Sequence, residues 1–418
     1  MKLKKGEDKK MNNMLKNKAE RMKENMIEFT RDLIKTPSES LNEKKVAGMV
    51  ESRMKELEYD MVFQDEWGNV VGVIHGHDAA PTVLLNAHMD TVPPNEIQWS
   101  HGPYDAKIEN DSIIGAGASD CKSGIAAQLY AGALLKHSLL PLKGNLIVAA
   151  TVAEENGRSI GVRTLMDHSL PSIGLKPSYA ILGEPTGLGL VYGHDGWVNL
   201  DIRVEGEQPF HVEDVANGIY KELEESHPFK KNENMGEVYS IQPPQFESRS
   251  GIRRGVIQMS QKIYQENDVE ELLFNVKKNA TYAAENYGAV AVMVDVRQEK
   301  QQLFTGKTVA VRNVVNAWTT DPFHPLIERS RQTLAAAGLS AKPIKWQLNK
   351  LEMGTAGSVL VNEYKIPTVG FGPGLIDQAH AVDECVPMDN IVKAAYGTAA
   401  IVHGLIGIPV FGWTSNEI

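Results

Sequence analysis

Apolar residues follow two patterns that alternate over most of the chain. Short and almost uninterrupted apolar runs predict strands that are buried on both faces of a sheet. They lie at 70–74, 82–86, 145–151, 179–182 and 367–371. Longer segments with apolar residues at helical spacing predict amphipathic helices at 25–34, 41–57, 123–136, 325–337 and 389–406. This alternation predicts an α/β domain with a mixed, mostly parallel sheet sandwiched by helices.

The pattern changes between about residues 195 and 320. Here apolar and polar residues alternate, which predicts strands with one exposed face at 199–205, 255–263 and 290–296. Helices are expected at 212–225 and 268–286. We therefore expect a small α+β domain inserted into the larger one. Residues 1–194 and 319–418 would form the two parts of the larger domain, and residues 195–318 the insert.

Chain length and net charge limit the classes of protein to which this chain can belong. A chain of 418 residues is expected to form about two domains. Its net charge of −10 argues against a nucleic-acid partner, and the lack of a long uncharged apolar run argues against a membrane span. The basic first 25 residues lack the apolar core of a secretory signal. We interpret them as a solvated segment running into a helix rather than a membrane- or partner-binding arm.

The sequence contains two cysteines, Cys121 and Cys385, and no disulfide framework. This usage fits the reducing cytoplasm, which is the expected location. Both cysteines lie close in sequence to candidate metal ligands. We interpret them as small buried residues rather than thiolate ligands, because the nearby nitrogen and oxygen ligands suffice.

Most of the histidine and carboxylate side chains that could hold a metal directly follow strand-like runs. All the candidates together are His88 and Asp90 in LLNAHMDTVPP, Asp120 in GAGASDCKSG, Glu154 and Glu155 in VAATVAEENG, Glu184 in AILGEPTG, and His380 in QAHAVDE. Strands carry such residues to the rim of a sheet, where α/β proteins place their chemistry. Imidazole and carboxylate together suit zinc, and also cobalt or manganese.

Taken singly, these residues have ordinary structural alternatives. Asp120 also fits the N-cap of the next helix, and the Glu154–Glu155 pair also fits a solvated acidic turn. However, adjacent carboxylates at the end of a buried strand repel each other unless a cation compensates. We therefore assign Glu155 as a metal ligand and Glu154 as the general base. Asp90, two residues after His88, would orient the imidazole.

Together the candidates form two sets of three ligands that share one carboxylate. The first set is His88, Asp120 and Glu184, and the second is Asp120, Glu155 and His380. Two divalent ions, zinc first with cobalt or manganese as alternatives, would share one water. They would acidify that water and polarise a substrate carbonyl.

The stretches NAHMDTV, GAGASDCKSG, AEENG, GEPT and GFGPG…AHAVDE resemble, in this order, the M20 family of metallohydrolases. That family includes acetylornithine deacetylase, succinyl-diaminopimelate desuccinylase, aminoacylase and carboxypeptidases. The resemblance implies a zinc-peptidase-like catalytic domain with an inserted lid through which subunits dimerise. It implies the same ligands, the base Glu154 and the supporting Asp90. RDLIKTPSES…EKKV and YAILGEPT…VY further resemble a subgroup of hydrolases linked to selenium-dependent metabolism, which gives no substrate.

The expected lid departs from the family pattern. The family carries a lid histidine that reaches the partner subunit's site. His211 in EGEQPFHVEDVANGIYKEL is our candidate for it, and His194 is a weaker one. Lys262 stands near the position of the arginine that commonly grips the substrate carboxylate in the family. Other basic residues that could replace that arginine are Arg253, Arg254 and Arg297.

The expected function is a dinuclear-metal amide hydrolase acting through metal-bound water. It would remove the acyl group of an N-acyl amino acid or cleave a dipeptide-like C-terminal amide. Its partners would be such a small molecule or short peptide and a second copy of the chain, with no nucleic acid and no membrane. One alternative is a metal-binding protein that holds a metabolite without hydrolysing it. Another is an aminopeptidase of the same family, although no carboxylate for a substrate α-amine is identifiable.

Overall fold

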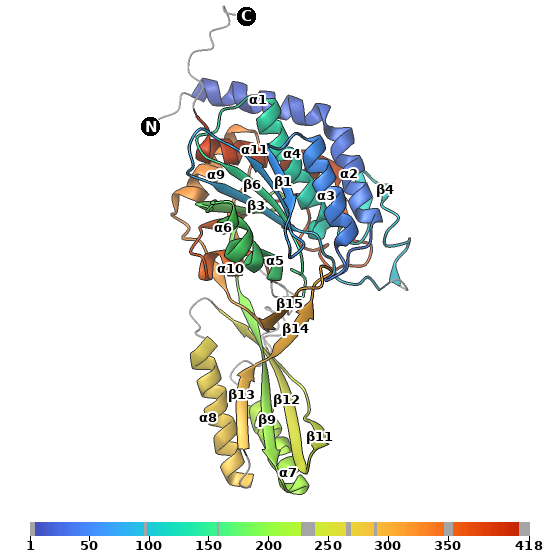
Figure 1. The fold of residues 1–418 in the computed structure, drawn as a ribbon, viewed down its shortest axis with the longest axis vertical. Coiled ribbons are helices and arrows are strands. Elements are labelled where there is room, and N and C mark those ends of the chain that lie inside the picture. Colours follow the sequence, from blue (N-terminus) through green and yellow to red (C-terminus); the bar gives the residue numbers. More distant parts are fainter. Residues whose placement is uncertain are drawn as a thin grey trace, which may run out of the picture.

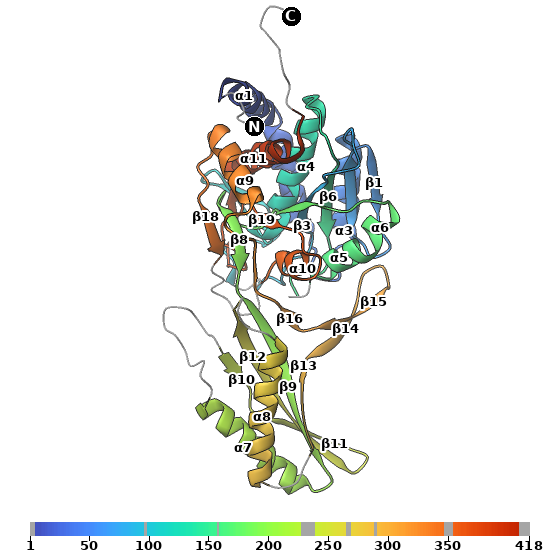
Figure 2. The same ribbon diagram turned by 90° about the vertical axis from the view of Figure 1, so that its left-hand side faces the viewer.

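The computed structural model describes residues 5–95, 98–156, 159–226, 239–264, 269–287, 291–346 and 354–408. Figures 1 and 2 show a broad upper body built on one large sheet and a narrow lower body built on a second sheet. The predicted fold class, a mixed α/β sheet with helices and an α+β insert, is confirmed.

The large sheet has the order β1-β2-β6-β3-β7-β19-β8-β17, with β18 beside β8. Its strands are β1 Met61–Gln64, β2 Val70–Ile74, β3 Val83–His88, β6 Leu146–Thr151, β7 Tyr179–Leu182, β8 Leu190–His194, β17 Trp318–Thr319, β18 Pro343–Trp346 and β19 Thr368–Gly370. In the centre, β6, β3, β7 and β19 are mutually parallel. Their carboxyl ends therefore lie along one edge of the sheet, which is where the candidate ligands follow β3, β6 and β7.

Helices cover both faces of the large sheet, which explains why β2, β3 and β6 are buried throughout. Neighbouring residues in a strand point to opposite faces, so Leu85 joins one apolar cluster and Leu84 another. The first cluster includes residues of the helices α1 Lys5–Arg21, α2 Lys23–Lys35, α3 Lys44–Glu56, α4 Ser123–His137, α9 Pro325–Ala336 and α11 Met388–Ile406. The second includes residues of α5 Ile160–Thr164, α6 Leu170–Ser172 and α10 Gly357–Asn362.

The basic N-terminal segment is not the solvated leader that we expected. It forms α1, and Leu15 and Ala19 on this helix are fully buried in the larger core. None of the helices that the structure describes is both long and apolar enough to cross a membrane.

The lower body is an antiparallel sheet with the order β10-β12-β9-β13. Its strands are β9 Gly196–Gly206, β10 Tyr239–Ile241, β11 Gln245–Arg249, β12 Ile252–Ile263, β13 Ala291–Val296 and β16 Val314–Val315. The helices α7 Pro209–Ser226 and α8 Val269–Tyr287 supply apolar residues to its core. Alternate residues of β9, such as Leu200 and Ile202, are fully buried in that core, as the alternating pattern predicts.

The two bodies are joined by two adjacent connections. β8 ends at His194 in the large sheet and β9 begins at Gly196 in the second. The chain comes back from the lower sheet to the large sheet between β16, which pairs with β9, and β17, which pairs with β8. A hairpin of β14 Gln298–Gln302 and β15 Thr308–Arg312 lies between the bodies (Figure 2). Leu303 and Val311 of this hairpin belong to the larger core, although their segment falls within the predicted insert.

Candidate metal centre

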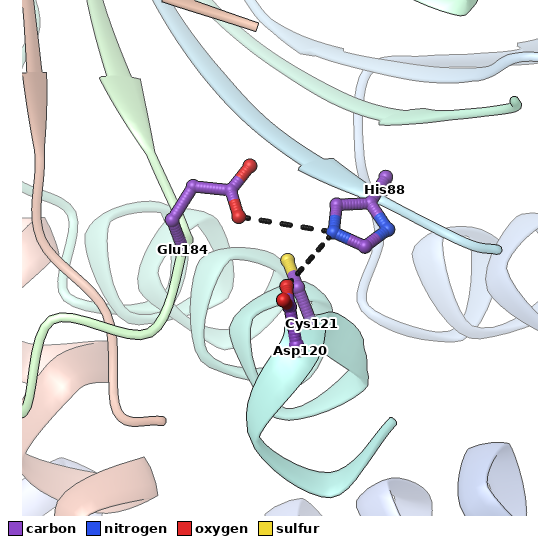
Figure 3. A group of neighbouring side chains, drawn as sticks. All are labelled: His88, Asp120, Cys121 and Glu184. Carbon is purple, nitrogen blue, oxygen red and sulfur yellow. Dashed lines mark hydrogen bonds and ion pairs between the residues drawn. The ribbon is translucent and has the colours of Figure 1, made fainter. Parts of the chain in front are cut away.

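His88 is the last residue of β3, and its ring lies among candidate ligands (Figure 3). The side chain is 2% exposed. Its Nε2 atom lies 3.1 Å from Asp120 Oδ1 and 3.7 Å from Glu184 Oε2. Its Nδ1 atom lies 2.9 Å from the backbone oxygen of Asp90 and 3.5 Å from Asp90 Oδ1. Asp90 is thus placed to fix the ring so that Nε2 faces Asp120 and Glu184.

Asp120 lies between two imidazoles. Its Oδ1 faces His88, while its Oδ2 lies 3.6 Å from Nε2 of His380. The backbone around Asp120 is held by Glu384, which accepts hydrogen bonds from the backbone N–H groups of Gly117, Ser119 and Asp120 at 2.7–2.8 Å. If two cations bind here, Asp120 is the residue that would serve as a ligand to both.

The second group forms around His380. Nε2 of His380 lies 2.7 Å from Oε2 of Glu155, which follows β6. A cavity of about 170 Å³ opens beside this group, with Thr91, Val92 and Trp99 among its lining residues. Three ligand atoms from Asp120, Glu155 and His380 lie within 4.8 Å of one another, as do those of the first group. The two groups share Asp120, so every predicted ligand lies in one or both.

Asp90 also has a second set of contacts that the sequence did not reveal. Its Oδ1 accepts from the backbone N–H of Glu154 at 3.0 Å, and its Oδ2 accepts from that of Glu155 at 2.9 Å. The hydroxyl of Ser40 donates to Oδ2 at 2.6 Å. Asp90 therefore positions both the histidine of one group and the turn that carries the two glutamates.

Cys121 is fully buried and lies next to Asp120 (Figure 3). Its sulfur lies within 4.8 Å of the ligand atoms of the first group. Burial raises the pKa of this thiol to about 12. Its Sγ donates to the backbone oxygen of Gly183 at 3.6 Å. A thiol that is protonated at neutral pH fits our interpretation of a small buried residue.

Buried acidic groups create a demand for positive charge. Burial raises the pKa of Glu155 to about 7 and that of Glu384 to about 8. The pKa of Glu154 is raised well above its usual value, through burial and the neighbouring carboxylates. Among the described residues, Oε1 of Glu155 and Oε1 of Glu184 are buried without a hydrogen-bond donor. Since orphaned carboxylate oxygens are costly in a protein interior, this donor set fits divalent cations.

His380 is a base within this acidic group, so burial and the neighbouring carboxylates shift its pKa in opposite directions. Burial alone would lower its pKa, but the hydrogen bond to Glu155 and the nearby Asp120 outweigh burial and raise the pKa to about 9. A cation between these groups would replace the proton that joins them, because metal ligands bind as neutral imidazole and ionised carboxylate.

The residues expected from the lid do not join either group within one chain. His211 is exposed in the first turn of α7, in the lower body (Figure 1). His194 is fully buried, with Nε2 2.9 Å from the Thr355 hydroxyl oxygen. Lys262 pairs with Asp195 at 3.4 Å. The three arginines also form ion pairs: Arg253 with Glu213, Arg254 with Glu205 and Glu247, and Arg297 with Asp201.

Residues 84–403 match the family model described as peptidase family M20/M25/M40. This chain belongs to that family. YgeY of Escherichia coli K12 is 28% identical over 418 residues, covering 92% of this M20 chain and 95% of YgeY. Acetylornithine deacetylase of Klebsiella pneumoniae is 32% identical over 212 residues, covering 47% of this chain and 53% of that enzyme.

Solved structures show the same fold. The crystal structure of Bacillus subtilis YxeP, described as a dinuclear metal binding peptidase, superposes with a TM-score of 0.68 at 15% identity, covering 93% of this chain and 99% of YxeP. Family membership makes this M20 chain a metal-dependent hydrolase of amide bonds, as predicted. The resemblance to M20 hydrolases is confirmed, whereas the selenium-linked subgroup stays a prediction.

Proposed function

We propose that this M20 protein removes the acyl group from an N-acyl amino acid, or cleaves a comparable amide of a dipeptide-like substrate. The observation that carries the proposal is the placement of Glu154 and Glu155 after β6, beside two histidine–carboxylate groups that share Asp120. The similarity to acetylornithine deacetylase supports the deacylase side of the proposal.

The proposed cofactor is a pair of divalent ions, zinc first, with cobalt or manganese as alternatives. The proposed ligand sets are His88, Asp120 and Glu184, and Asp120, Glu155 and His380. When bound, such a pair lowers the pKa of water and polarises a carbonyl group. Asp90 keeps His88 and the glutamate turn in place through its carboxylate and backbone oxygens.

Glu154 is the proposed general base. It is 6% exposed, its Oε1 accepts from the Ser159 hydroxyl at 3.1 Å, and its side chain belongs to neither ligand group. In the metal-loaded protein, where the nearby cations favour the ionised form, this carboxylate can take a proton from water and return it to the leaving nitrogen. The same group thus serves both steps of amide hydrolysis.

The test of the proposed function is a substrate panel. Protein loaded with zinc or cobalt should hydrolyse at least one class among N-acetyl, N-succinyl and other N-acyl amino acids and dipeptides, and a chelator should abolish that activity. If the loaded protein hydrolyses none of them, the proposal is wrong. Calorimetric binding without turnover would then favour the alternative, a metal-binding protein that holds a metabolite.

We further propose a cytoplasmic homodimer that forms through the lower body. β13 is an outer strand of its sheet, and α8 beside it exposes Phe274 and Tyr282 at 65% and 61% (Figure 1). Exposed aromatic residues next to a strand that pairs on one side only, among the segments that the structure describes, favour association with a second copy. Such a dimer would give His211 a route to the metal groups of the partner subunit.

Light scattering tests the proposed dimer. The expected molar mass is twice the 46.0 kDa of one chain. Phe274→Glu combined with Tyr282→Glu should shift the protein toward the monomer, because two charges would enter the apolar contact. A monomeric mass for the unchanged protein at micromolar concentration would contradict the proposal.

A further inference from the structure

Three consecutive backbone amides after β6 donate to two buried carboxylates from distant parts of the chain. The N–H of Ala153 donates to Oε1 of Glu43 at 3.0 Å. The next two amides, of Glu154 and Glu155, donate to the two oxygens of Asp90 at 3.0 and 2.9 Å. The direction of the whole turn is therefore fixed by Glu43 and Asp90 together.

Ala153 has a backbone conformation that needs such support. Its φ of 51° lies in the left-handed region, which is unfavourable for a residue with a Cβ atom. Strained backbone of this kind persists only where the surrounding structure over-determines it. Ala153 is packed in the larger core, and among the described residues its backbone hydrogen bonds are the one to Glu43 and a 3.2 Å bond from the N–H of Ile160 to the Ala153 oxygen.

Glu43 is fully buried immediately before α3. Its Oε1 also accepts from the backbone N–H of Leu41 at 3.0 Å, whereas its Oε2 has no hydrogen-bond partner among the described residues. Burial, together with the charge of Asp90, raises the pKa of Glu43 to about 7. A buried and only half-satisfied carboxyl destabilises the fold unless its remaining contacts compensate. Among the described parts of the chain, its one long-range hydrogen bond goes to the glutamate turn.

The loop before α3 supports the turn by two routes. Glu43 binds the Ala153 amide directly, and Ser40 donates to the Asp90 oxygen that binds the Glu155 amide. We propose that Glu43 is a positioning residue, which fixes the turn so that Glu154 and Glu155 point into the metal centre. The part that concerns Glu154 rests on the proposed function.

A purely structural role of Glu43 makes different predictions. Glu43 precedes α3 and bonds to Leu41, so it could simply stabilise the start of that helix. Its loss would then lower global stability, and each folded molecule would keep its metal affinity and turnover. A positioning role instead predicts local changes at residues 153–155 in molecules that stay folded.

The experiment compares Glu43→Ala, Glu43→Gln and the control Glu56→Gln. Glu56 is the last residue of α3, with 63% of its side chain exposed. Hydrogen–deuterium exchange at residues 153–155 is measured in metal-free protein, and zinc affinity by chelator competition. We expect Glu43→Ala to speed exchange at these amides and to weaken zinc binding about 10- to 100-fold, as loss of groups that orient ligands does. Glu43→Gln should keep most of the wild-type protection from exchange and most of the zinc affinity, because its amide oxygen can accept from the same N–H groups.

On a substrate from the panel, Glu43→Ala should lower kcat by a similar factor of about 10 to 100 and leave KM nearly unchanged. If Glu43→Ala does not fold, Glu43→Asp shortens the side chain, keeps the charge, and should speed exchange at Ala153. The proposal would be overturned if the folded variant had the same exchange rates at residues 153–155 and the same zinc affinity as the wild type. It would also be overturned if exchange rose equally throughout α3. If the wild type hydrolyses no substrate, the proposed function fails, but exchange and zinc affinity still decide the role of Glu43.

Discussion

Replacing Glu154 with glutamine should lower kcat by about 10²- to 10⁴-fold on any substrate that the wild type hydrolyses, which is the usual size of a general-base contribution. Glutamine has nearly the same shape and can still accept from Ser159, but it cannot take a proton from water. Because Glu154 belongs to neither ligand group, the variant should keep its metal content. KM should change little, since the lost interaction acts mainly in the transition state.

The measurement pairs steady-state kinetics with elemental analysis of the same samples. Glu328→Gln is a matched control, because Glu328 lies on α9 with half of its side chain exposed, away from the metal groups. Full activity in Glu154→Gln would exclude this residue as the base. Loss of activity together with loss of metal would instead make Glu154 a ligand, and the assignments of Glu154 and Glu155 would have to be exchanged.

The central strands were predictable because they are buried on both faces. β2 and β7 begin and end where the uninterrupted apolar runs do, and β3 extends to His88. Most of the candidate ligands could be found for the same reason, since His88, Glu155 and Glu184 lie at or just after the ends of such runs, whereas Asp120 and His380 follow glycine-containing turns. Burial on both faces leaves a continuous apolar signal that needs no knowledge of the neighbouring strands.

Other features depend on contacts between distant parts of the chain. β14 contains no apolar residue, and only the folded structure shows Leu303 and Val311 of this hairpin packed in the larger core. Glu43 and Glu384 are two of 53 acidic residues. What distinguishes them is the set of backbone amides that each one binds in the fold. Sequence spacing carries no signal for such bonds, because the partner segments are more than 100 residues away.

Removal of the metal ions should make the free energy of unfolding fall as pH rises from 7 to 9. In metal-free protein, Glu384 has a pKa of about 8 through burial, and His380 one of about 9 through its bond to Glu155. Both exceed the values in an unfolded chain, about 4.3 and 6.5. The folded state therefore holds protons that the unfolded chain has already released, and stability declines until pH passes the folded-state pKa.

The expected loss over this range is on the order of 2–4 kcal/mol, since one pKa unit corresponds to about 1.4 kcal/mol. Lys122 acts in the opposite direction, because burial lowers its pKa to about 7. His88 and Glu154, whose pKa values are raised well above normal, add to the loss. The buried His194 and His403, whose pKa values burial lowers to about 4, affect stability only below about pH 6.5.

Urea unfolding at pH 7, 8 and 9, with a chelator or with zinc, tests this expectation. Bound metal requires ionised carboxylates and neutral imidazoles among its ligands, and its charge favours the ionised form of the nearby Glu384, so the loaded protein should lose much less stability over this range. In metal-free protein, Glu384→Gln should reduce the slope, because one titrating group is gone, although its weaker bonds to the Asp120 loop lower stability at every pH. A metal-free protein whose stability is constant or rises from pH 7 to 9 would mean that these buried acids need no cation. The case for a dinuclear centre would then lose its electrostatic basis.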